Sequence, residues 1–137
     1  MAVPARLPVV LLTLRLSVFL VMLMWTVDKV IRPEHAGRVF ESFYGIAGLG
    51  GTAFRVLAVA ELLLLIVFLA GAWRRLSYGA VLVLHAISTL SSYRQYLSPF
   101  EGANLLFFAA WPMLAASIGL YLLRDHDTML TVAGRTT

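Results

Sequence analysis

Three side chains that carry or can carry a charge lie inside long apolar runs of this sequence: Arg15, Glu61 and His85. A charge in the middle of a membrane-crossing helix costs roughly 2.5 to 3.5 kcal/mol, so each needs a partner or a polar cavity. Counted from the predicted helix ends, their depths differ by only about 6 Å at about 1.5 Å of rise per residue. We therefore predict a buried ion pair between Arg15 and Glu61, with His85 beside it.

A row of polar residues accompanies the histidine on one helix face. The row comprises His85, Ser88, Thr89 and Ser92, with Tyr78 and Tyr96 extending it at either end. The spacing i, i+3, i+4 and i+7 places the first four on one side of a helix. Together with Arg15 and Glu61 they form the predicted intramembrane polar cluster. Two interpretations are open: a polar pocket for a proton path or small ligand, or interhelical hydrogen bonds that fix packing and register.

Other chemistries have little support. The chain has no cysteine, which excludes thiolate nucleophiles and iron–sulfur clusters. No metal site is predicted, because His85 lacks a second ligand on its own helix and His35 and His126 are expected on opposite membrane sides. No catalytic residue is predicted, since P-loop, GxSxG and HExxH motifs are absent. The Arg124–Asp127 run is expected to be a solvated end of the last helix.

The composition is that of a membrane protein. Hydrophobic residues make up 61% of the chain, charged residues 13%, and the mean hydropathy is +0.87. Four apolar runs are long enough to cross a bilayer core of about 30 Å. They cover about residues 8–27, 53–73, 76–92 and 103–123. We expect an all-α fold in which residues 1–137 form one antiparallel bundle of four transmembrane helices, the first being a retained span and not a cleaved signal peptide.

A further short helix is predicted between the first two spans, within residues 28–52. Pro33 suits a first helical turn and Glu34 complements the helix dipole. Apolar residues recur there at three- and four-residue intervals: Val39, Phe40, Phe43, Ile46 and Ala47. An amphipathic helix of this kind is typical of the membrane interface.

The basic residues predict an orientation and exclude one class of partner. Arg74 and Arg75 lie in a very short connection that would be hard to translocate, which places both termini in the cytoplasm. The eleven basic residues are otherwise scattered in ones and twos, so nucleic-acid binding is not expected. The lipid bilayer is the expected surrounding.

Several motifs together resemble the DoxX-like family of small four-helix membrane proteins, which includes the MauE type. The matching positions are Arg15-Leu16, Asp28-Lys29, Arg32-Pro33, Glu61, Gly71 before Arg74-Arg75, and His85. The order covers most of residues 13 to 124. The resemblance implies a bundle in the bacterial cytoplasmic (inner) membrane, with Arg15, Lys29 and Glu61 as the family-pattern positions. The chain departs from the pattern at Trp25 and Thr26, in a stretch where the family commonly has a glycine.

The functional expectation joins both lines of reasoning. The resemblance implies a non-catalytic subunit or accessory factor of a membrane-associated oxidoreductase or quinone-linked system, docked to a membrane or periplasmic protein or to further copies of itself. No resident cofactor is predicted, although a quinone beside His85 and Trp111 is an alternative. The rival function is a small carrier or channel for protons or a small solute through the polar interior.

Overall fold

The chain folds into helices and connecting segments over the part that the structure describes. The computed structural model describes residues 4–132, and no strand occurs in that range. Two of the helices, η1 and η2, are of the 3₁₀ type. In chain order the elements are α1 (Leu7–Ile31), α2 (Pro33–Tyr44), α3 (Gly51–Leu69), α4 (Arg74–Ser91), α5 (Tyr93–Leu97), η1 (Asn104–Ala109), α6 (Ala110–Leu122) and η2 (Arg124–His126).

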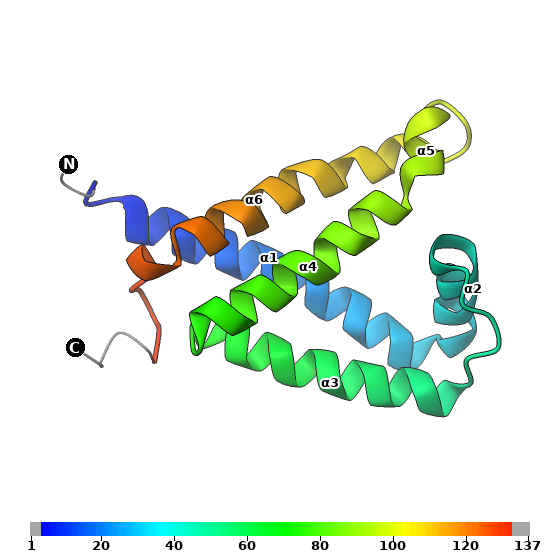
Figure 1. Cartoon of the computed structure of the whole chain (residues 1–137), viewed down its shortest axis with the longest axis horizontal. Helices are drawn as coiled ribbons and strands as arrows, with labels where there is room; N and C mark the ends of the chain where they lie inside the picture. The colour runs from blue at the N-terminus through cyan, green and yellow to red at the C-terminus, as the bar shows by residue number, and fades with distance from the viewer. Residues whose placement is uncertain (1–3, 133–137) are drawn as a thin grey trace.

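The long segments α1, α3, α4 and η1–α6 run alternately from one end of the molecule to the other (Figure 1). α1 packs against α3 and α6, and α4 packs against the same two helices. The start of α1, the α3–α4 turn and η2 lie together at one end, which we call the terminal end. α2 and α5 lie at the opposite end, the α2 end.

Three segments are long and apolar enough to span a membrane. They are α1, α3 and the continuous stretch Asn104–Leu122, with mean hydropathies of 2.4, 2.3 and 1.8. Few of their side chains are buried within the protein, and large apolar residues such as Leu20, Leu63 and Leu106 are exposed on the outside. An outer surface of this kind is suited to lipid rather than to water. The predicted membrane character of the chain is therefore supported, for three spans.

The helix boundaries differ from the predicted runs where charge or backbone conformation decides them. α1 continues past the predicted end at residue 27 to Ile31, and Pro33 then begins α2. The short helix predicted between the first two spans is present as α2, which ends at Tyr44, so the predicted members Ile46 and Ala47 lie beyond it. α3 ends at Leu69 and not at residue 73, because Gly71 takes a left-handed φ of 60° in the turn.

The last predicted run is divided. Its first part, Asn104–Ala109, is a 3₁₀ helix, and α6 begins only at Ala110. Pro112 is thus the third residue of α6, in the first turn, where its missing N–H removes no intrahelical hydrogen bond. The connection before it contains the short helix α5.

The buried core lies towards the terminal end. Its members are Leu11, Val18, Leu65, Phe68, Tyr78, Val81 and Leu120. The rings of Phe68 and Tyr78 meet edge to face, with their centroids 5.0 Å apart.

At the α2 end, two aromatic pairs make the contact. The ring centroids of Phe40 and Phe54 are 5.1 Å apart, and those of Phe43 and Phe107 are 5.7 Å apart. These pairs attach the apolar face of α2 to α3 and η1.

Candidate functional site

Arg15 pairs with the end of the chain and not with Glu61. Its Nη1 lies 3.3 Å from Oδ2 of Asp127, and neither residue is accessible to solvent. Nη2 donates to the backbone carbonyls of Met129, at 2.6 Å, and Leu130, at 3.3 Å. Residues 127–132, which we call the strap, thus neutralise and solvate a cation about eight residues inside α1.

Tyr78 of α4 completes this network. Its hydroxyl donates to Oδ2 of Asp127 at 2.6 Å and accepts from Nη1 of Arg15 at 3.2 Å. Two buried polar atoms in the same network, Nε of Arg15 and Oδ1 of Asp127, have no partner among the described residues. Tyr78 is buried on α4 as His85 is, seven residues earlier, and contacts Arg15 nearer the terminal end.

Two hydrogen bonds hold the strap and η2 against the α3–α4 turn and the start of α4. The N–H of Val132 donates to the carbonyl of Ala70 at 2.9 Å, and Nη1 of Arg74 donates to the carbonyl of Arg124 at 2.7 Å. Position 71 in this turn requires glycine, because a Cβ there would lie 2.5 Å from both Nη1 of Arg15 and Cγ2 of Thr131. The absence of a side chain there allows the guanidinium and the strap to pass closely over the turn.

Glu61 has a different partner, Lys29. Its Oε2 accepts from Nζ of Lys29 at 2.7 Å and lies 3.0 Å from the hydroxyl of Thr26. Because α1 remains helical to Ile31, Thr26 and Lys29 stand three residues apart on the face towards α3. The predicted Arg15–Glu61 pair is wrong. Similar depth in two helices does not determine which way each side chain faces, and each of these two charges has another partner of opposite charge nearby.

The Lys29–Glu61 pair predicts a measurable coupling. Both side chains are largely shielded, with exposed fractions of 13% and 21%. Glu61→Gln is expected to lower the free energy of unfolding by about 1 to 3 kcal/mol, because a charged acceptor is lost next to a lysine in an apolar setting. Unfolding by SDS titration from mild-detergent micelles measures it. The double variant Glu61→Gln/Lys29→Met should lose less unfolding free energy than the sum of the losses in the two single variants. Strictly additive losses would contradict the pairing.

His85 binds to the backbone of α6. Its Nε2 lies 3.0 Å from the carbonyl oxygen of Ala110, and because a carbonyl only accepts, Nε2 carries the proton in this contact. The hydroxyl of Thr89 is 3.3 Å from the same nitrogen and donates to the carbonyl of His85 at 2.8 Å. His85 therefore joins α4 to the first turn of α6 and does not contact Arg15 or Glu61 within the described hydrogen bonds.

The rest of the polar row makes local contacts. The hydroxyl of Ser92 donates to the backbone carbonyl of Ser88 at 3.1 Å. Tyr96 packs its ring against Phe108 at 5.3 Å and against Trp111 at 5.5 Å. Burial raises the pKa of the Tyr96 hydroxyl above its ordinary value of 10.0, so this group stays protonated at neutral pH.

Sequence reasoning missed two features. Asp127 was expected to be solvated, yet it is buried against Arg15; the topology already placed both residues at the same membrane end, which was the available signal. The second missed feature is a polar contact at the α1–α2 corner. There a carboxylate oxygen of Asp28 accepts from Nε of Arg32 at 2.6 Å, and the other lies 2.6 Å from Nδ1 of His35. No group of three metal-binding side chains occurs among residues 4–132.

The candidate site is therefore three separate polar contacts and not one cluster. They are the Arg15–Tyr78–Asp127 network, the Lys29–Glu61–Thr26 contact, and the His85–Ala110 contact. Searches against family models, curated proteins and solved structures found no match to the chain. The DoxX-like resemblance stays a prediction, and the function has to be argued from these residues.

Proposed function

We propose that α4 is a fourth membrane span, so that the chain forms an antiparallel four-helix transmembrane bundle. α4 has 18 residues, or about 27 Å of helix, close to the bilayer core of about 30 Å. Four of its polar residues are buried: Ser77, Tyr78, His85 and Thr89. Large apolar residues near its end are exposed, with Ile87 at 50% and Leu90 at 62%. A low mean hydropathy is therefore compatible with a lipid-facing surface.

The proposed orientation places the terminal end in the cytoplasm of a bacterial cell and the bundle in its inner membrane. The support is the short α3–α4 connection with Arg74 and Arg75, together with Arg6 and Arg124 at the same end. α2 would then lie at the outer interface, with its apolar face on the bundle and Glu34, Arg38 and Glu41 exposed.

Within this bundle we propose a non-catalytic role, as a DoxX-like subunit or accessory factor of a membrane-associated oxidoreductase. The observation that supports it is the engagement of the interior charges: Arg15 is held by Asp127, and Glu61 by Lys29. His85 is tied to a backbone carbonyl. Groups occupied in this way stabilise helix register, which suits a scaffold for a partner.

A carrier role has weaker support. A path for protons or a small solute needs polar groups that follow one another through the bundle. The described polar contacts instead fall into three separate places. The helices that carry them, α1, α3 and α4, also contribute the apolar side chains Val18, Leu65 and Val81 to the buried core. We therefore favour the accessory role.

The test is co-purification in a mild detergent from the native membrane, with an affinity tag on the intact chain. We expect a stoichiometric partner that carries a redox cofactor, identified by mass spectrometry and by its absorption spectrum, and no quinone turnover by the isolated chain. A matched tagged four-span protein of unrelated sequence controls for carry-over. Quinone turnover by the chain alone, or proton flux in proteoliposomes that Glu61→Gln abolishes without unfolding, would overturn the proposal.

A further inference from the structure

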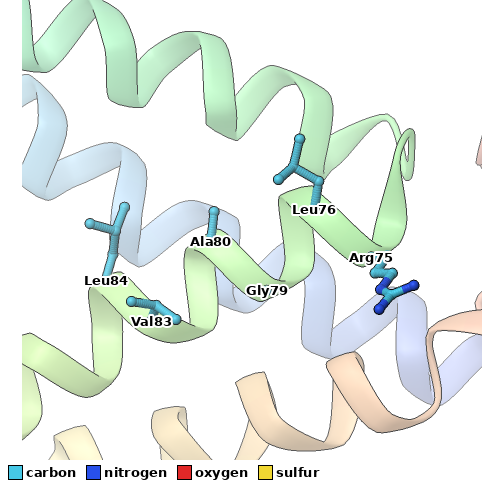
Figure 2. A pocket seen from close by; sticks show the side chains of 6 residues that line it. All are labelled: Arg75, Leu76, Gly79, Ala80, Val83 and Leu84. Atoms are coloured by element: carbon cyan, nitrogen blue, oxygen red, sulfur yellow. The ribbon is translucent and has the colours of Figure 1, made fainter.

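The outer face of α4 carries a shallow groove of about 460 Å³ near the terminal end (Figure 2). Six residues of α4 line it: Arg75, Leu76, Gly79, Ala80, Val83 and Leu84. They form two neighbouring rows with four-residue spacing, and the middle member of each row, Gly79 or Ala80, is small. The groove is thus apolar and is deepest at its centre, where Gly79 and Ala80 lie. Its one charged lining residue, Arg75, lies at one end.

The dimensions of the groove match one leaflet of a bilayer. From Arg75 to Leu84 the helix rises about 13 Å, nearly half of a hydrocarbon core of about 30 Å. Trp73, 75% exposed at the start of α4, lies at the level where amphipathic rings meet the headgroups. Arg75 therefore stands at headgroup level, while Val83 and Leu84 lie at the depth of the acyl chains.

The charge at the rim is available. Arg74 is used within the protein, donating to the carbonyls of Gly71 at 3.2 Å and Arg124 at 2.7 Å. The guanidinium of Arg124 lies 4.8 Å from the centre of the Tyr121 ring. Arg75, by contrast, is exposed and takes part in none of the ion pairs found within residues 4–132.

We propose that this groove binds an anionic phospholipid of the terminal-end leaflet, with the phosphate on Arg75 and one acyl chain along Leu76–Leu84. The inference rests on the proposed placement of α4 in the membrane and not on the accessory role. A second copy docked through the same face, with its axis along the membrane normal, would bring Arg75 towards its own counterpart. Like charges oppose that contact, whereas an anionic headgroup complements it.

A second groove lies between α1 and α3. It is lined by apolar residues of α1 and α3 together with Thr26, and the nearby lysine, Lys29, is already bound to Glu61. Arg55, one helical turn before Ala58 and Val59 of this second groove, is exposed, so it supplies an internal comparison for Arg75.

The test uses the full chain in vesicles of equal phosphatidylglycerol and phosphatidylcholine, extracted gently and examined by native mass spectrometry. Wild-type protein should retain phosphatidylglycerol preferentially, and Arg75→Gln should reduce that preference about fivefold, as expected for one basic residue at the surface. Ala80→Leu, which fills the furrow, should reduce retained lipid of both kinds. Arg55→Gln and Ala60→Leu make the same changes at exposed positions of α3, outside this groove, and should have smaller effects.

Each contrary outcome is informative. Equal retention of both lipids by the wild type, or an equal loss in Arg55→Gln, overturns the inference. A photo-crosslinker at position 83 that captures a polypeptide in place of lipid overturns it as well. Extraction of the chain by alkaline carbonate would instead reject the membrane placement, so the two failures are distinguishable.

Discussion

Asp127→Ala is expected to lower the free energy of unfolding by about 3 to 5 kcal/mol, one of the largest effects of a single substitution in this chain. Removing one partner of a buried ion pair leaves the other uncompensated, and Arg15 has no access to water. The hydroxyl of Tyr78 also loses its acceptor at 2.6 Å. SDS titration from mild-detergent micelles, followed by tryptophan fluorescence, measures the change.

Asp125→Ala is the matched control, since it removes the same charge two residues earlier from an exposed position. It should change the free energy of unfolding by less than about 0.5 kcal/mol. Arg15→Met in the Asp127→Ala background should recover part of the loss, because the unpaired charge is then gone. If Asp127→Ala were as stable as Asp125→Ala, the strap would have no part in neutralising Arg15.

The sequence predicted helices well because lipid leaves the backbone few choices. A run of apolar residues must satisfy its own N–H and C=O groups, so the helical segments follow hydropathy to within a few residues. The exceptions have local causes. α1 extends to Ile31, just before Pro33 begins α2, and α3 stops at Leu69 because Gly71 adopts a left-handed conformation.

The partners of the buried charges could not be predicted in the same way. Depth along a helix is readable from residue number, but the direction of a side chain around the helix depends on packing. Arg15 and Glu61 have similar predicted depths and still bind different partners, Asp127 and Lys29. The sequence predicts a solvated end for the last helix, whereas in the fold the segment that follows it turns back over the terminal end.

The turn beneath the strap leads to the second large expected effect, that of Gly71→Ala. A left-handed backbone costs a non-glycine residue about 1 to 2 kcal/mol. The new methyl group would also lie 2.5 Å from Nη1 of Arg15 and from Cγ2 of Thr131, so both side chains must move away from it. We expect overpacking to add about 1 to 3 kcal/mol, measured by the same SDS titration.

Gly45→Ala separates the two contributions. Gly45 has nearly the same φ, 68° against 60° at Gly71, but no atom lies within 4 Å of a Cβ built there. Gly45→Ala should therefore show the backbone cost alone, and the excess in Gly71→Ala should report the contact with Arg15 and the strap. In the Asp127→Ala background, where the strap is loosened, that excess should shrink. An unchanged excess would mean that Gly71 is constrained by the α3–α4 turn and not by the strap above it.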